Sequence, residues 1–484
     1  MQHATAQLRR IPYLEIIRPL LIVCGVLFAC TYIPYNLPSY VLLLIASIAP
    51  AIFVGLQLKN NMGLSILSVV PLCILVNYDL GTGTGTSVGL PLMVLCLLVG
   101  LWLFDMFVLE RKFSFVASRS MKPLVIFAMA TVVAFLIGQL GWFYLPSAPL
   151  AAQLGGVTIF ILSFCAFFLV ANQLEPVWLE RMVWLYIILG GIYVFARSLE
   201  LWTIVDTFFH WKARGSLFWA WLTAMCGGQL LFNRKLGWRV QVGLVVVLGC
   251  VLYLTVINNF DWKSGWIPML AVLMVLVGFK WQGLIMRYFL IIIPIGALAM
   301  IYAIQQIVST DQYSYLTRLD AWWIMWQLIK YNPFTGLGPA NYYWYTPIYP
   351  IRGYAVQFNS HHQLLDIVAQ TGFIGLFCYF WFFAALFRIG WRMRRQIADG
   401  FPQAYLYSVL AGIVGTLVAS MLGDWVLPFV YNIGLEGLRT SLPAWMFMGG
   451  LVIYERILRD EQEDSTLPIA PKRENLMQSE ANGW

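Results

Sequence analysis

The chain of 484 residues is 61% hydrophobic and only 11% charged, with a mean hydropathy of +0.76; soluble globular domains carry about 25% charged residues, so this composition excludes one. The formal net charge of +8 is mostly a signal of membrane topology and is given no weight as evidence for nucleic acid, because no basic run on the predicted cytoplasmic face is interleaved with stacking aromatic residues in a pattern that suggests it. We predict an all-α polytopic membrane protein whose first partner is the lipid bilayer.

Apolar runs of about 15 to 25 residues recur along the whole chain, and each is long enough to cross a hydrocarbon core as a helix. These runs predict about 12 to 14 transmembrane helices. The predicted spans are residues 14–32, 40–58, 64–76, 88–108, 124–144, 154–174, 182–202, 218–232, 240–257, 266–279, 288–307, 364–387, 405–426 and 445–457.

Lysine and arginine gather in loops that fall on one side of this arrangement, such as "NRKLGWR" and "RIGWRMRR". Short cytoplasmic loops retain positive charge, so this side and both termini are predicted to be cytoplasmic. We expect four parts. They are N-terminal transmembrane helices in residues 1–307, an external loop in 308–360, C-terminal transmembrane helices in 361–458, and a disordered cytoplasmic tail in 459–484.

The external loop is rich in aromatic residues, so we expect it to be folded onto the membrane surface. Thr317 and Asp320 form a capping box and Asn332-Pro333 is a stop signal, which together predict an amphipathic helix between them. Arg318 lies on the apolar face of that helix, which is expected at headgroup depth. The face is formed by Trp322, Met325, Trp326 and Ile329.

A tight turn and an aromatic cluster follow this helix. Gly336, Gly338 and Pro339 permit the turn, and the cluster "YYWY" occupies residues 342–345. Aromatic faces with polar rims suit sugar rings, so Tyr342 and Trp344 are candidate substrate-binding residues. An aromatic belt at the membrane interface is the alternative interpretation.

The segment "FNSHHQLLDIVAQTGFIGL" places two adjacent histidines at the start of an apolar run. Ser360 and Gln363 form a second capping box, which predicts Ser360 as the N-cap and His361 and His362 in the first helical turn. That end of a helix disfavours a protonated imidazole. Either histidine is therefore expected to stay neutral and to act as a base or a hydrogen-bond partner.

A polar stripe at helical spacing is formed by His362, Asp366 and Gln370. Asp366 is therefore a candidate to orient the imidazole of His362. The alternative is that these groups satisfy one another inside the bundle. Neither a metal nor a cofactor is predicted, because adjacent helical histidines point about 100° apart and the chain has no HExxH or CxxC pair.

Arg318 with its tryptophans, "NPFTGLGPANY" and "NSHHQLLDIVAQTGFIGL" together resemble the signature of the O-antigen ligase and Wzy-type polymerase superfamily, bacterial membrane glycosyltransferases of the GT-C type. The resemblance covers residues 318–376; elsewhere it rests on hydropathy and topology. The chain departs from the family at His362, where asparagine is usual, and at Gln370, where glutamate is usual. The family positions that it keeps are Pro333, Gly336, Gly338, His361, Leu365, Gly372, Gly375 and Leu376.

The resemblance implies an enzyme that moves a glycan from an undecaprenyl diphosphate carrier to a hydroxyl of a glycan, lipid or protein acceptor. It implies a metal-independent reaction, without a cofactor, on the external (periplasmic) side of the bacterial plasma (inner) membrane. The candidate catalytic residues by resemblance are His361 and Arg318. The polar stripe instead favours His362 as the base, and His362 and Asp366 are retained as candidate substrate-binding residues.

Two further cations are candidates for the diphosphate of the donor, because a leaving diphosphate needs positive charge facing it. The family's "SRG" segment resembles "WKSG" here, so Lys263 would replace an arginine, and Arg214 lies in the external "KARGS". Contact with lipid headgroups is the alternative for both side chains.

Three functions are consistent with these features. A ligase would join a finished glycan to its acceptor, and a polymerase would extend another carrier-linked repeat with the same kind of donor. A transporter or flippase for lipid-linked sugars belongs to a different class and predicts matched pairs of interrupted spans, which the sequence does not show.

Overall fold

The computed structural model describes residues 60–76, 79–81, 87–112, 115–287, 305 and 312–466, and the structural statements below concern this part of the chain. It is an all-α membrane protein, as predicted, and every predicted span that falls within the described residues coincides with a helix. Predicted spans 14–32 and 40–58 lie outside the described residues, as does 288–307 apart from residue 305.

Seven helices of the described residues are long and apolar enough to cross a membrane. They are α4 with its π-helical end (Leu90–Leu109), α6 (Leu150–Gln173), α7 (Pro176–Ser198), α10 with its π-helical end (Trp238–Ile257), α11 (Lys263–Lys280), α16 (Gln363–Met393) and α17 (Phe401–Leu422). Three shorter apolar helices are α3 (Met62–Leu75), α5 (Met121–Ile137) and α9 (Ser216–Phe232).

The other elements are shorter or lie at the ends of the bundle. The remaining α-helices are α8 (Trp202–Phe208), α12 (Gln282–Arg287), α14 (Gln312–Ile329), α15 (Asn341–Tyr345) and α18 (Leu438–Thr466). The 3-10 helices are η4 (Trp211–Arg214), η6 (Thr346–Ile348) and η7 (Leu435–Gly437). Strands β1 (Asp79–Gly81) and β2 (Ser87–Gly89) pair antiparallel.

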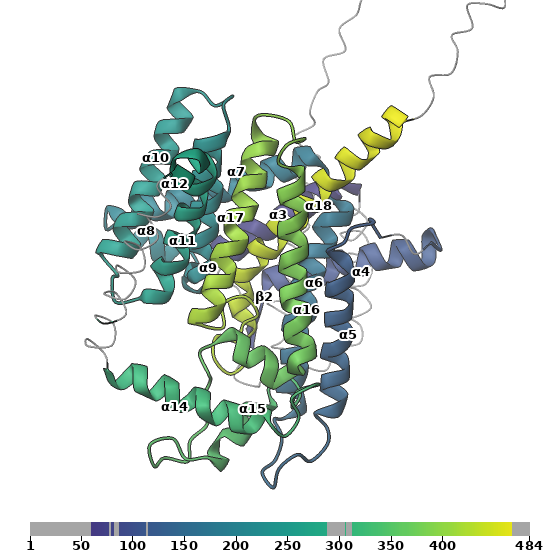
Figure 1. The fold of residues 1–484 in the computed structure, drawn as a ribbon, viewed down its shortest axis with the longest axis vertical. Helices are drawn as coiled ribbons and strands as arrows, with labels where there is room; N and C mark the ends of the chain where they lie inside the picture. The colour runs from purple at the N-terminus through teal and green to yellow at the C-terminus, as the bar shows by residue number, and fades with distance from the viewer. Residues whose placement is uncertain are drawn as a thin grey trace, which may run out of the picture.

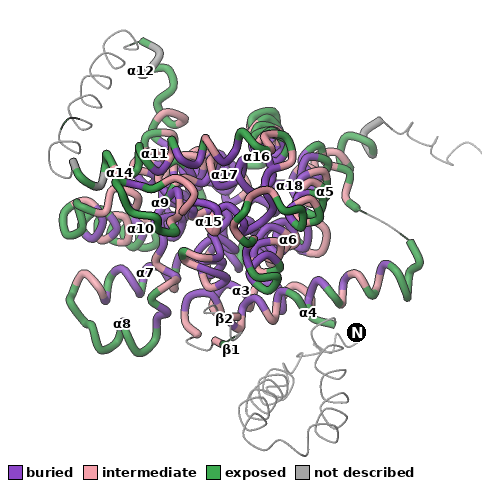
Figure 2. The backbone as a smooth tube through the Cα atoms, turned by 90° about the horizontal axis from the view of Figure 1, so that it is seen from below, coloured by how far each residue is buried: buried purple, intermediate pink, exposed green. Residues whose placement is uncertain are grey.

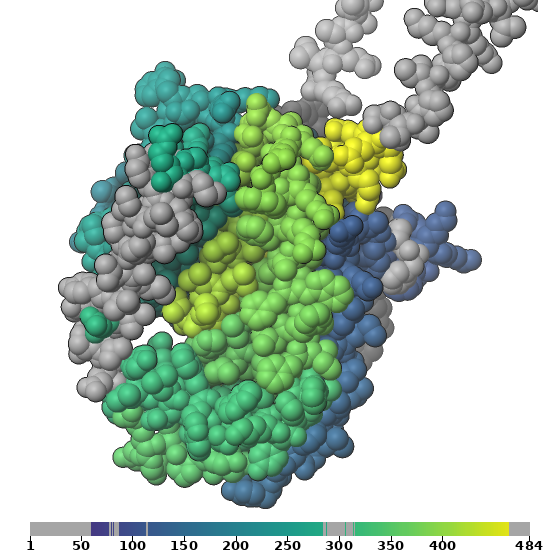
Figure 3. Space-filling view, viewed as in Figure 1, coloured from purple at the N-terminus to yellow at the C-terminus, as the bar shows by residue number. Residues whose placement is uncertain are grey.

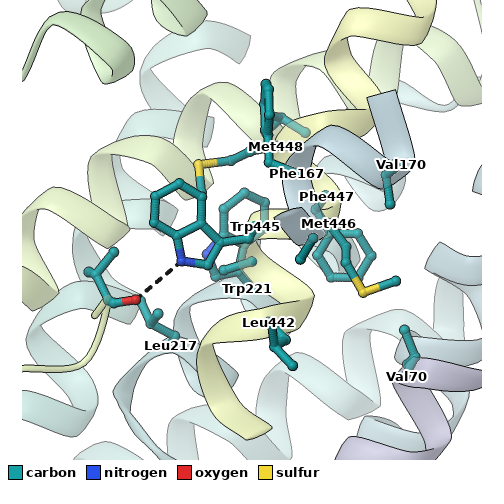
Figure 4. Close-up of a cluster of buried hydrophobic side chains, with 14 of the residues drawn as sticks. Val70, Phe167, Val170, Leu217, Trp221, Leu442, Trp445, Met446, Phe447 and Met448 are labelled. Atoms are coloured by element: carbon teal, nitrogen blue, oxygen red, sulfur yellow. Dashed lines mark hydrogen bonds between the residues drawn. The ribbon is translucent and has the colours of Figure 1, made fainter. Parts of the chain in front are cut away.

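The core of the bundle is built by α9, α17 and the first half of α18, which are buried on almost every side (Figure 2). Figure 4 shows Trp221 of α9 beside Trp445 of α18 in this core. A buried indole needs a partner for its N–H group. Trp221 donates to Thr416 Oγ1 (3.0 Å) and Trp445 donates to Val426 O (3.2 Å), so both rings are fixed in orientation.

The loops at the two ends of the bundle differ in charge. Helix α16 starts at the same end as α6, because Asn341, near the start of α16, accepts a hydrogen bond from the Ala148 N–H group (3.1 Å). At the opposite end, Gly400 lies against the side chain of Lys235. That opposite end carries the basic segments 233–239 and 388–395, so positive charge is concentrated away from the start of α16.

Helix α14 lies across one end of the bundle (Figure 1), and residues 312–360 cover that end (Figure 3). The external loop is therefore folded, as predicted, over its described residues. The predicted start at Thr317 is wrong: α14 begins at Gln312, and the Thr317 hydroxyl donates to Tyr313 O (2.7 Å) inside the helix. A threonine hydroxyl inside a helix bonds to the carbonyl four residues earlier instead of capping.

The predicted apolar face of α14 is only partly correct. Met325 and Ile329 are buried against the bundle, but the Trp326 side chain is 43% exposed. The contact with lipid headgroups stays a prediction. The predicted tail is also corrected, because α18 continues to Thr466 and residues 459–466 are therefore helical.

Candidate functional site

Helix α16 is interrupted at Gly372, which has φ 69° and ψ −174°. This conformation is essentially restricted to glycine. The interruption frees backbone groups that an unbroken helix would pair internally. The turn at residues 333–338, called the glycine turn below, satisfies them, and Leu337 N–H donates to Ala369 O (2.8 Å).

The glycine turn approaches α16 so closely that side chains are excluded. A Cβ atom on Gly336 would lie 2.5 Å from the Gln370 carbonyl carbon, and one on Gly372 would lie 2.0 Å from Phe334 O. The predicted tight turn is confirmed. In the structure, this turn places a backbone segment against the interrupted helix α16.

The carboxylate of Asp366 is buried beneath this turn. Its Oδ1 accepts hydrogen bonds from the Tyr342 hydroxyl (2.6 Å) and from Ser360 Oγ (2.7 Å). One turn later, the side chain of Gln370 accepts from the Ala340 N–H group (3.2 Å). Asp366 Oδ1 and Gln370 are therefore paired inside the protein, in line with the alternative interpretation of that stripe, whereas Asp366 Oδ2 is buried without a hydrogen-bond partner among the described residues.

His362 does not occupy the first turn of α16. It is the N-cap residue, because the helix begins at Gln363, and Ser360 Oγ accepts the His362 N–H group (3.0 Å) instead of capping. His362 Nδ1 is buried and has no hydrogen-bond partner among the described residues, while its ring packs edge-to-face on Trp322 (5.0 Å between centroids). The prediction that Asp366 orients this imidazole is wrong.

His361 precedes the helix in a left-handed conformation (φ 50°) and is more exposed than its neighbours. Its N–H group donates to Asn359 Oδ1 (2.8 Å). Partial burial lowers the pKa of His361, and so does the Arg318 guanidinium, whereas the Asp424 carboxylate raises it. The net pKa lies below the ordinary value of a histidine. The surroundings of the imidazole, and not a helix end, therefore favour its neutral form.

Arg318 is exposed on α14 and is near enough to His361 to influence its pKa. The side chain has no ion-pair partner in the described ranges. Two residues later, Asp320 pairs with Arg352 (3.0 Å). Arg318 therefore lies at the same end of the bundle as His361, and its charge has no ion-pair partner among the described residues.

The two aromatic candidates differ in exposure. Tyr342 is fully buried and its ring stacks on Phe429 (4.7 Å between centroids), so it cannot present a face to a sugar and that prediction is wrong. Its hydroxyl binds Asp366 instead. Trp344 is partly exposed and donates to the Tyr431 hydroxyl (2.7 Å), so its substrate-binding role stays a prediction.

Sequence reasoning missed the loop between α17 and α18, residues 423–437, which joins the parts of the site. The Gln363 side chain accepts the Leu427 N–H group (2.9 Å), so Gln363 anchors this loop and does not complete a capping box. Asp424 is buried and accepts the Phe429 N–H group (2.9 Å). The sequence did mark Asp424 as a candidate, because it is an acidic residue at the end of an apolar span and such residues are often functional.

Arg214 and Lys263 occupy two neighbouring helix starts. Arg214 ends η4, pairs with Asp206 (3.6 Å), and has a buried Nε without a hydrogen-bond partner among the described residues. Lys263 is the first residue of α11, and its Nζ donates to Phe260 O (3.0 Å). Lys263 Nζ also lies 4.0 Å from Asp261 Oδ1, so each of the two cations has a carboxylate neighbour.

Trp425 contacts residues that are next to these two cations in the chain. A Cβ atom on Gly215, next to Arg214, would be 3.0 Å from the Trp425 ring. The ring of Trp262, next to Lys263, lies 6.0 Å from that of Trp425. Trp425 follows Asp424, so the elements that carry both cations pack against the loop 423–437 at the end of the bundle where α16 starts.

One group of residues has the composition of a metal site. Asp79, His210 and Glu436 place ligand atoms within 4.8 Å of one another. Each carboxylate, however, is already in an ion pair. Asp79 pairs with Arg439, and Glu436 pairs with Lys212. His210 Nδ1 accepts the Lys212 N–H group (3.1 Å), which puts the ring proton on Nε2, toward Asp79. We interpret this group as an ion-pair network.

No family model matches the chain, and no curated protein matches it. The chemistry of the site is therefore argued from its geometry. At the end of the bundle where α16 starts, the structure places an exposed imidazole with Arg318 near it, and Arg214 and Lys263 on elements that pack against Trp425. Such a group can accept a proton and hold an anion.

Proposed function

We propose that this protein is a membrane glycosyltransferase, a ligase that moves a glycan from an undecaprenyl diphosphate carrier to an acceptor hydroxyl. The proposal is carried by the His361 imidazole with Arg318 near it, and by Arg214 and Lys263 on elements at the same end of the membrane-spanning bundle. Glycan transfer needs a base for the acceptor and positive charge for the leaving group, and this group of residues supplies both.

In the proposed reaction the acceptor oxygen attacks the anomeric carbon of the donor sugar. The bond from that carbon to the diphosphate oxygen breaks, and its electron pair leaves with undecaprenyl diphosphate. His361 takes the proton of the acceptor hydroxyl. Arg318 and Arg214 would bind diphosphate oxygens in pairs, whereas Lys263 would act as a point charge.

The proposed site faces the outside of a bacterial inner membrane. Support comes from the basic segments 233–239 and 388–395, which lie at the opposite end of the bundle. Because positively charged loops stay in the cytoplasm, that end would be cytoplasmic. A lipid carrier in the outer leaflet would then present its diphosphate to the bundle end that holds His361.

The test is glycan assembly in a strain that lacks the protein, complemented with wild type, His361→Ala or Arg318→Ala at matched membrane levels. We expect both variants to leave long carrier-linked glycan that does not reach an acceptor. Accumulation of single carrier-linked repeats would instead assign a polymerase. The matched control is Arg352→Ala, because this arginine of the same segment is already paired with Asp320 and its loss should preserve the wild-type pattern.

Restoration of the wild-type pattern by both His361→Ala and Arg318→Ala would refute the transferase. Transport of a lipid-linked sugar would then be the function to test, by following carrier-linked glycan across the membrane of inverted vesicles.

A further inference from the structure

The position of Arg214 is set by a buried residue that the proposed chemistry does not use. His210 is 3% exposed and directly precedes the 3-10 helix η4, which ends at Arg214. Its Nδ1 accepts the Lys212 N–H group (3.1 Å) and so caps η4. Its own N–H group donates to Ile74 O (2.8 Å). The backbone of His210 therefore ties the start of η4 to the end of α3, while the imidazole caps η4.

The other side of the same imidazole is held by charged groups. His210 Nε2 lies 3.1 Å from Asp79 Oδ2, and the other oxygen of Asp79 pairs with the buried Arg439. Glu436 pairs with the side chain of Lys212. These contacts clamp the ring between strand β1 and the start of α18, so its rotation would break several interactions at once.

We propose that His210 is a positioning residue that sets the place of the Arg214 guanidinium in the donor site, an inference that rests on the proposed function. Arg214 follows His210 by four residues, and the intervening backbone is the short helix that the imidazole caps. Because Nδ1 must accept an N–H group, only the form unprotonated at Nδ1 performs this role. Loss of the cap would release η4 and displace the guanidinium.

The surroundings of His210 keep it in the required form. Burial and the charge of Arg439 lower the pKa of His210, whereas Asp79 and Glu436 raise it. The net pKa lies below the ordinary value of a histidine. The cap is therefore complete at pH 7 and is lost in acid, where a protonated Nδ1 would face the Lys212 N–H group.

Steady-state kinetics of the full-length protein in lipid nanodiscs test this role, with carrier-linked glycan extracted from the deletion strain as donor. His210→Ala should raise the KM for the donor about fivefold, the effect of losing one N-cap, and leave kcat nearly unchanged. Asparagine caps helices without titrating. His210→Asn should therefore keep the wild-type KM and lose the rise in KM that wild type shows below about pH 6.5.

A double-mutant cycle shows whether His210 acts through Arg214. In an Arg214→Ala background, His210→Ala should change KM by less than about twofold. Thr207→Ala is the matched control, because this exposed threonine of α8 bonds only to Thr203 O (2.6 Å) within its own helix. It should leave KM at the wild-type value.

The outcomes that overturn the inference differ from those that overturn the proposed function. A full fivefold effect of His210→Ala in the Arg214→Ala background, or an effect on kcat alone, would refute positioning. So would a His210→Asn variant that behaves like His210→Ala. Absence of transfer by wild type from this donor, or an unchanged KM in Arg214→Ala, would instead refute the proposed donor site and the inference with it.

Discussion

Replacing Gly372 by alanine tests the joint between α16 and the glycine turn. The backbone conformation at Gly372 costs about 1–3 kcal/mol for a residue with a side chain. The new Cβ would lie 2.0 Å from Phe334 O, so the turn must move. Two hydrogen bonds would then break, Phe373 N–H to Pro333 O (2.8 Å) and Ile374 N–H to Phe334 O (3.3 Å). At about 0.5–1.5 kcal/mol each, the total loss of unfolding free energy is about 2–6 kcal/mol.

The assay is denaturant unfolding in micelles, followed by tryptophan fluorescence. Gly243→Ala in α10 is the matched control, because no atom lies within 4 Å of a Cβ at that position and alanine favours a helix by about 0.5–1 kcal/mol. The control should be as stable as wild type or slightly more stable. A loss below about 1 kcal/mol in Gly372→Ala, within the range of an ordinary surface change, would refute the proposed strain and contact.

Four other results are expected. Because His361 must be neutral to act as a base and its pKa is lowered, activity should persist to below about pH 6.5 and then fall. Arg318→Ala removes a neighbouring positive charge and should raise the pKa of His361 in an NMR titration; a lower pKa would contradict the assigned cause. Tyr342→Phe removes one of the two donors to Asp366 and should lower the free energy of unfolding by about 1–3 kcal/mol, whereas the exposed Tyr354→Phe should change it by less than about 0.5 kcal/mol. In a cysteine-free background, an impermeant maleimide added to whole cells should label Tyr354→Cys and not Arg395→Cys, and the reverse pattern would invert the proposed orientation.

Hydropathy alone located the membrane-spanning helices within the described residues. A helix in lipid must satisfy its own backbone hydrogen bonds, so a long apolar run has few alternative structures. The glycine turn could also be predicted from the sequence, because Gly336 and Gly338 adopt positive φ values of 73° and 91° that other residues rarely adopt. These features depend on residues close together in the chain.

Local patterns were less reliable at helix starts. Both capping boxes were wrong, because Thr317 lies inside a longer helix and Ser360 donates to Asp366. A capping pattern shows that a residue is able to cap. Whether it does depends on which carboxylates and carbonyls the rest of the protein places nearby.

Tertiary structure alone decided which groups share the site. Asp366 was expected beside His362, but the packing of the glycine turn gives it Tyr342 and Ser360. The contact between His210 and Asp79 joins residues 131 positions apart, and no local spacing marks it. Helical periodicity assigns a side chain to a face, whereas its partner on the next element is set by how the whole bundle packs.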